Sequence, residues 1–294
     1  MVEIIFQNRT DAIKCYDHLW KCLMHVPDMK NILLLEDRYR VKIQDSLISE
    51  NVLEYVKVGF YQFITTVKRD DWFHEILSNQ FYYKDTEEQQ QILEILYSIL
   101  EGQREDLSVF IKDTNEDPKI KEAIEQIFHD QVSFSFDSFV KFRLRSYLQY
   151  LERYVEVSID EYKMEQEYQM FVQMLRDFLV GRAPKTDILY LLLDEEITFY
   201  NKQFDEIKRS ELTKMIDRKL LVNHPIYVDS ATIAPLLSLA PITIYIYTKD
   251  KDAPLVRTIQ NIFEERVIIK PYQSLRDLEQ FGGYIDGKSE QHGS

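Results

Sequence analysis

Short apolar runs lie near both ends of the chain, and a three- to four-residue apolar period fills the middle. Residues 2–6 and 31–44 are rich in Val, Ile and Leu, which predicts a strand and a hairpin turning at residues 36–38. A helix is expected between them, from about Thr10 to Met24. The first 48 residues therefore predict a short βαββ element.

A helical period takes over from about residue 50 and continues to about residue 81. Its apolar positions are Leu53, Val56, Phe60, Phe63, Ile64 and Val67. A second helix should run from Thr86 to Glu101, because Gly102 is a natural C-terminal cap. These patterns begin a helical core that we expect over residues 49–182.

The longest helical pattern covers residues 139–179 and carries two apolar faces. We expect any break in this helix near Val157 and Ser158. One face forms a core stripe, made of Val140, Leu144, Tyr147, Leu148, Leu151, Val155, Ile159 and Tyr162. A second face, about 100° away on a helical wheel, holds Phe139, Arg143, Tyr150 and Tyr154. Because a helix with two apolar faces is buried between neighbours or binds a partner, these four are candidate partner-binding residues.

Basic residues on the same helix do not form one row. Lys141 and Arg145 fall on a different side from Arg143, near Glu152 and Glu156. The helix also carries many carboxylates, which a helix that follows a nucleic-acid backbone should not do. The pattern therefore disfavours a nucleic-acid-binding module.

The sequence pattern changes from long helices to short strands and helices after Gly181–Lys185, where Gly and Pro occur together. Residues 187–193 and 197–201 predict a hairpin, and short helices are expected over 210–221 and from about Thr232. Strand, helix and strand follow over 242–248, 254–265 and 266–271, which predicts a parallel βαβ unit. We expect an α/β subdomain at 183–275, a disordered tail at 276–294, and a predominantly helical α+β fold as a whole.

Composition and charge indicate which ligands and which compartment to expect. The 294 residues carry a formal charge of −14, which repels nucleic acid and anionic lipid. Two cysteines and no basic, apolar leader favour the cytoplasm. The uncharged stretch Ala231–Thr248 is long enough to span a membrane, but Pro235 and Pro241 interrupt it. We expect a helix followed by a strand there, and no membrane span.

Cysteine and histidine spacing raises a metal hypothesis. Cys15, His18, Cys22 and His25 lie within one stripe of a helix, but the first and last are about 15 Å apart along it. Only His18 and Cys22 could share an ion, and they would need ligands from elsewhere. The stripe borders an apolar face, so the core border is the favoured interpretation, and we expect no metal or cofactor.

An acidic pattern offers the alternative of an enzyme. Asp194, Glu206 and Lys208 on adjacent strands would supply the carboxylates and the lysine of a metal-dependent nuclease. The favoured interpretation is a hairpin turn at Asp194 and solvated side chains at the other two. No sequence motif of nucleophilic catalysis is present, so no catalytic residue is assigned.

The stretch "YLERYVEVSIDEYKMEQEYQMFVQMLRDFL", preceded by "FVKFRLRSYL", resembles the YtxC-like family of sporulation proteins. The later segment "LLSLAPITIYIY" is also similar to that family. The resemblance implies a cytoplasmic protein linked to sporulation and carries over no catalytic residues. We therefore expect a non-enzymatic interaction or regulatory protein, with a protein partner or self-association. A nuclease-like enzyme and a nucleic-acid-binding module remain the alternatives.

Overall fold

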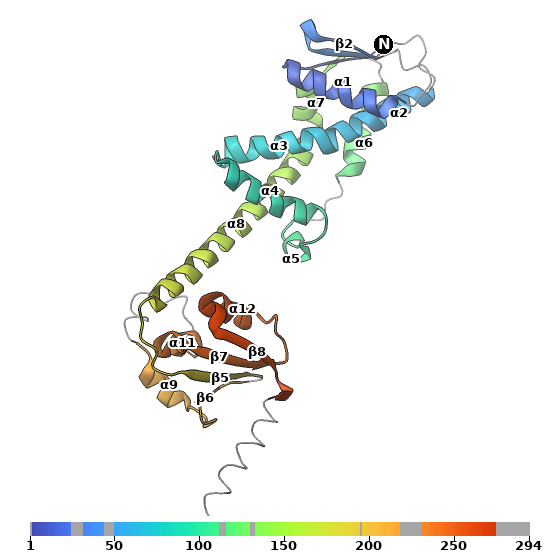
Figure 1. Cartoon of the computed structure of the whole chain (residues 1–294). Helices are drawn as coiled ribbons and strands as arrows, with labels where there is room; N and C mark the ends of the chain where they lie inside the picture. The colour runs from blue at the N-terminus through green and yellow to red at the C-terminus, as the bar shows by residue number, and fades with distance from the viewer. Residues whose placement is uncertain are drawn as a thin grey trace, which may run out of the picture. The chain divides into compact units, whose positions relative to one another are not determined.

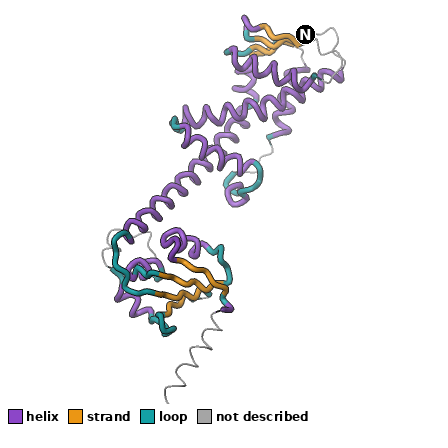
Figure 2. The backbone as a smooth tube through the Cα atoms, viewed as in Figure 1, coloured by secondary structure: helices purple, strands orange, loops and turns teal. Residues whose placement is uncertain are grey.

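The computed structural model describes residues 2–24, 32–43, 50–111, 116–129, 133–194, 196–217 and 231–274 (Figure 1). It has the predicted fold class, a predominantly helical α+β fold (Figure 2). The chain divides into two compact units, Met1–Met164 and Glu165–Ser294, each described below by itself. The finer division at residues 48, 182 and 275 stays a prediction, and the tail at 276–294 lies outside the described residues.

The first unit begins with the predicted βαββ element. Strand β1 (Val2–Ile5) pairs antiparallel with β3 (Arg40–Ile43), which pairs antiparallel with β2 (Ile32–Leu35) across the turn η2 (Glu36–Arg38). Helix α1 (Arg9–Leu23) buries Ala12, Cys15, Leu19 and Leu23. The alternation and the helical period are local signals, so these elements were predictable.

A fourth strand completes this sheet and was not predicted. Strand β4 (Phe134–Ser135) pairs parallel with β1, which gives the order β2-β3-β1-β4 among the described strands. Two residues are too few to show an alternating pattern. The strand exists because the chain returns to the free edge of β1.

The helical run from residue 50 to residue 80 is interrupted by two π segments. Helix α2 (Glu50–Gln62) continues into η4 (Phe63–Lys68), α3 (Arg69–Glu75) and η5 (Ile76–Gln80). A π turn holds one residue more than an α turn, so it shifts the buried face. The α period predicts Val67 on that face, whereas Lys68 is the residue that is 3% exposed. The first π segment therefore brings a lysine inward.

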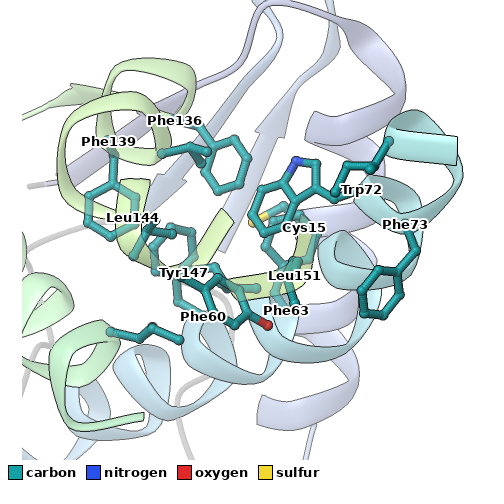
Figure 3. Packing of buried hydrophobic residues seen from close by; sticks show 14 of the residues in the cluster. Cys15, Phe60, Phe63, Trp72, Phe73, Phe136, Phe139, Leu144, Tyr147 and Leu151 are labelled. Carbon is teal, nitrogen blue, oxygen red and sulfur yellow. The ribbon is translucent and has the colours of Figure 1, made fainter. Parts of the chain in front are cut away.

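The remaining helices of this unit enclose an aromatic core. They are α4 (Thr86–Leu100), α5 (Glu105–Ser108), α6 (Asp117–His129), α7 (Phe136–Arg143) and the first part of α8 (Arg145–Leu179). Phe60 lies at the centre (Figure 3), with five phenylalanine rings at centroid distances of 5.6–6.3 Å.

The predicted position of the helix break was wrong. Val157 and Ser158 are helical, and the Ser158 hydroxyl donates to the Tyr154 carbonyl at 2.8 Å without leaving the helix. The break lies at Leu144, whose backbone has φ −106° and ψ 18°. Residues 139–143 and 145–179 therefore belong to two helices, and a single helical wheel does not describe both.

The second unit has a sheet of order β6-β5-β7-β8 in its described part. Strand β5 (Ile188–Leu193) pairs antiparallel with β6 (Ile197–Tyr200) and parallel with β7 (Thr243–Thr248), which pairs parallel with β8 (Val267–Pro271). The helices are α9 (Arg209–Met215), α11 (Ile233–Leu239) and α12 (Pro254–Phe263), with the turn η6 (Glu264–Arg266). The predicted hairpin and βαβ unit are both confirmed.

The uncharged stretch in this unit forms α11 and then β7, as expected. None of the helices in the described ranges combines the length and apolarity needed to cross a membrane. The core here joins residues from α8, the sheet and α12, such as Leu175, Leu191, Ile246 and Ile259.

Candidate functional site

A buried ion cluster links α1 to the π segment η4. The Lys68 ammonium lies 2.9 Å from Asp11 Oδ1 and 3.4 Å from Asp71 Oδ2, and its side chain is 4% exposed. Lys14 approaches the other oxygen of Asp71 at 2.6 Å. We call Asp11, Lys14, Lys68 and Asp71 the ion cluster. Its two cations and two carboxylates balance, which makes their burial tolerable.

The start of α1 holds Asp11 in place. The Asn8 side chain accepts a hydrogen bond from the Asp11 backbone NH at 2.8 Å, and its Nδ2 donates to Asp11 Oδ2 at 3.0 Å. This reciprocal arrangement caps the helix and orients the carboxylate towards Lys68. The position of the ion cluster is therefore set by a helix N-terminus and a π segment together.

Burial perturbs the titration of two groups here. Burial alone would lower the pKa of Lys68, but the hydrogen bond and charge of Asp11 and the charge of Asp71 outweigh it, so the pKa is raised. Burial raises the pKa of the Glu75 carboxyl above its ordinary range, and Lys68 opposes that shift only in part. Lys68 is thus a fixed cation, whereas Glu75 can change its charge.

A groove of about 650 Å³ opens beside the ion cluster. Helix α3 provides Trp72 and Glu75, α7 and the start of α8 provide further residues, and Lys68 and Asp11 also belong to the lining. A smaller hollow of about 350 Å³ shares four of these residues and extends along α8 as far as Glu152. The shared residues are Trp72, Glu75, Arg145 and Leu148. We call the first and larger of the two the charged groove.

The charged side chains of the groove fall into two groups. Asp11 and Lys68 belong to the ion cluster, and Asp137 accepts a hydrogen bond from the Gln7 backbone NH at 3.2 Å. Glu75, Lys141 and Arg145 make no ion pair within the part of the chain that the structure describes. The groove therefore presents two cations and the Asp137 carboxylate from α7–α8, and the Glu75 carboxylate from α3.

Apolar side chains complete the groove. Phe136 and Trp72 are 2% and 8% exposed, while Phe142 at the rim is 73% exposed. The Lys141 ammonium lies 5.7 Å from the centre of the Phe142 ring. Six of the twelve lining residues are charged, so the groove is more polar than a typical small-molecule pocket, and charge is the main feature that it offers to a ligand.

The predicted partner-binding residues lie elsewhere, on two different helices. Phe139 is 2% exposed in the aromatic core, and Arg143 is exposed and donates to Gln126 at 2.9 Å. Tyr150 and Tyr154 are half-buried, and their hydroxyls share a hydrogen bond of 2.9 Å. The break at Leu144 separates the first pair from the second, so the four do not form one face.

The candidate metal ligands form a local contact. Cys22 Sγ lies 3.5 Å from His18 Nε2 and donates to Gln62 Oε1 at 3.3 Å. Burial raises the pKa of Cys22 and lowers that of His18, so both are neutral at pH 7. Among the residues described, no three His, Cys, Asp or Glu side chains gather as a metal site.

The three nuclease candidates are not brought together. Asp194 follows Leu193 at the turn end of the hairpin and pairs with Lys249 at 2.6 Å. Glu206 forms an isolated β-bridge with Tyr200, and Tyr200 pairs with Tyr190 at the other end of the hairpin. Four extended residues separate the two ends by about 13 Å. Lys208 precedes α9 and is exposed.

Sequence reasoning missed the charged groove, although a local signal existed. The run Lys68-Arg69-Asp70-Asp71-Trp72 places four charges within an otherwise apolar helical pattern. Lys141 and Arg145, which the wheel separated from the aromatic face, both line the groove, although the break at Leu144 places them on two helices. The pairing of Lys68 with Asp11, 57 residues away, had no sequence signal.

Comparison with known proteins gives one family. The model of the YtxC-like family matches residues 54–268. The chain is 33% identical over 279 residues to the uncharacterized protein YtxC of Bacillus subtilis (strain 168), and the match covers 95% of this chain and 97% of the relative. No solved structure matches the chain.

Proposed function

The chain belongs to the YtxC-like family, and from this premise we propose that it is a non-enzymatic protein of sporulation that acts in the cytoplasm by binding a protein partner. The observation that carries the proposal is the charged groove, where Glu75, Lys141 and Arg145 lie unpaired around an apolar base. Charges that make no internal ion pair are free to select a partner.

The chemistry of the groove supports binding rather than covalent catalysis. Its described lining contains no Ser, Thr, Cys, Tyr or His side chain. Lys68 is the only deeply buried amine there, and its raised pKa keeps it protonated. A protonated amine held by two carboxylates is a poor nucleophile. These residues can bind a partner without taking part in a covalent step.

The test compares two neighbouring arginines. Arg145→Glu reverses a charge in the groove, whereas Arg143→Glu reverses an exposed charge that lies outside the groove lining. We expect Arg145→Glu to reduce the yield of heat-resistant spores and Arg143→Glu to leave it near that of the wild type. Circular dichroism and thermal melting of both purified chains verify that they fold.

Two results would count against the proposal. Unchanged spore yield in a folded Arg145→Glu, Phe142→Asp double variant would remove the groove as the working surface. A loss of yield with Tyr150→Ala and Tyr154→Ala, but not with the groove variants, would assign the binding role to the tyrosine pair.

A further inference from the structure

The arrangement of charge in the groove defines the class of its occupant. We propose that the charged groove binds a short amphipathic peptide segment of a partner protein, with the carboxylates of the peptide on Lys141 and Arg145 and its apolar side chains against Phe142 and the exposed part of Trp72. This inference rests on the proposed function, in which the groove is the docking site.

The cationic side of the groove carries the first step. Lys141 near the end of α7 and Arg145 at the start of α8 are both exposed and both line the groove. Neither has a carboxylate partner in the ranges that the structure describes. A guanidinium can bind a carboxylate through two parallel hydrogen bonds, and an ammonium acts as a point charge beside it. Asp137 of α7 also lines the groove, so this side carries two cations and one carboxylate and favours an acidic ligand by one net charge.

The carboxylates of the groove give the ligand a direction. Asp11 is satisfied by Lys68, and Asp137 already accepts from the Gln7 backbone. Glu75 alone projects an unpaired carboxylate from α3. It repels an acidic side chain, so the acidic side of a peptide must face α7–α8. The peptide should therefore bind in a single orientation.

The size and apolarity of the groove indicate side chains rather than a folded domain. A volume of about 650 Å³ accommodates a few side chains. Trp72, Phe136 and Val140 are each less than 10% exposed, so only a small part of each can contact a ligand, whereas Phe142 is 73% exposed. Aromatic and aliphatic anchors supply most of the affinity of peptide recognition. The exposed Phe142 ring can cover an anchor from the rim.

The experiment uses tryptophan fluorescence of the full chain. Trp20 and Trp72 are the two tryptophans, so Trp20→Phe leaves Trp72 as the reporter inside the groove. A displayed library of random peptides of about 12 residues, roughly three helical turns, is selected for binding to this chain. We expect the selected peptides to combine Asp or Glu with an aromatic or aliphatic residue, and to change Trp72 emission on binding. Raising the salt concentration should weaken them, because exposed charges are screened.

Charge reversal tests the assigned contacts. Lys141→Glu with Arg145→Glu should weaken the selected peptides by about tenfold, since two attractive contacts become repulsive. Arg143→Glu is the matched control and should change affinity less than about twofold. Selected peptides that are basic, or that keep their affinity for the double variant, would overturn the assignment. So would a wild-type dimer by analytical ultracentrifugation that Arg145→Glu converts to a monomer, because a second copy would then be the occupant.

Failure of this inference is distinguishable from failure of the proposed function. Loss of spore yield in Arg145→Glu without acidic peptides in the selection would keep the docking role and reject the peptide class. Acidic peptides that bind at Trp72, with unchanged spore yield in Arg145→Glu, would keep the peptide class and reject the role of the groove in sporulation.

Discussion

The ammonium of Lys68 lies 2.9 Å from the Asp11 carboxylate, although 57 residues separate them in the sequence. Their side chains are 4% and 16% exposed. The net stabilisation from so deeply buried a pair is smaller than its electrostatic attraction, because both charges lose hydration. Removal of one partner is nevertheless severe, because the other stays buried without compensation.

Lys68→Met should therefore lower the free energy of unfolding by about 3 kcal/mol, because it leaves Asp11 uncompensated. Urea denaturation at neutral pH measures the change. Lys14→Met is the control, since Lys14 pairs with Asp71 but is 39% exposed, and its effect should stay below about 1 kcal/mol. Equal stability of Lys68→Met and the wild type would show that the ion cluster does not hold α1 to η4.

Glu75 should make stability depend on pH in the acidic range. Burial raises its folded-state pKa above the ordinary value of 4.5, so the folded chain binds the proton more tightly than the unfolded chain. The stability from this group is fully present below pH 4.5 and is lost as the pH rises through the folded pKa. Glu75→Gln should therefore gain stability relative to the wild type across that window, as followed by urea denaturation at several pH values. A constant difference between the two chains would contradict the shift.

Gly59 should tolerate Ala far better than Val. A Cβ added at Gly59 would lie 3.0 Å from Leu19 Cδ2 and 3.4 Å from Cys22 Cβ, where α2 crosses α1. Ala gains about 1 kcal/mol of helix propensity against this crowding, so Gly59→Ala should change stability by less than about 1 kcal/mol. Gly59→Val has a smaller gain in helix propensity and adds two methyl groups to the crowding, so it should lose about 2 kcal/mol in thermal or urea unfolding. Equal stability of the two variants would mean that the helices can separate at this crossing.

The same substitution at two exposed tyrosines should have opposite signs. Tyr82 is 76% exposed with φ 61°, a backbone conformation that favours glycine, whereas Tyr55 is 54% exposed within α2. Tyr82→Gly should raise the free energy of unfolding by about 0.5 kcal/mol, because it relieves the left-handed conformation. Tyr55→Gly should lower it by about 0.5 kcal/mol through helix propensity. Destabilisation by both would show that Tyr82 makes a contact that outweighs its strain.

Local patterns predicted most of the elements, and failed where the chain departs from a regular period. The strands and α1 follow alternation and an amphipathic period, so they were found. The α period assigned Val67 to the interior, and Val67 is partly buried against the core, but the extra residue of a π turn also buries Lys68. The break at Leu144 occurs without Pro or Gly, so no residue type announced it.

The site was less predictable than the fold, for a physical reason. Lys141 and Arg145 are close in sequence, but the break at Leu144 places them on two helices, α7 and α8. Their opposing residue, Glu75, comes from another helix, and its position depends on how α3 packs against α8. Trp72 and Tyr147, with ring centroids 6.2 Å apart, fix that packing through a contact across 75 residues of sequence. A single sequence contains no signal for such a pairing.

The short strand β4 gives the first unit a definite order of assembly. Strand β1 is synthesised long before its parallel partner at Phe134–Ser135, and the Gln7 to Asp137 hydrogen bond spans 130 residues. The nascent chain can pair β1 with β3 once the β2–β3 hairpin has been synthesised, yet one edge of β1 stays open until β4 has been synthesised. During that interval the exposed edge is open to pairing with other strands. Chaperone demand during synthesis should therefore end only after residue 135 has emerged.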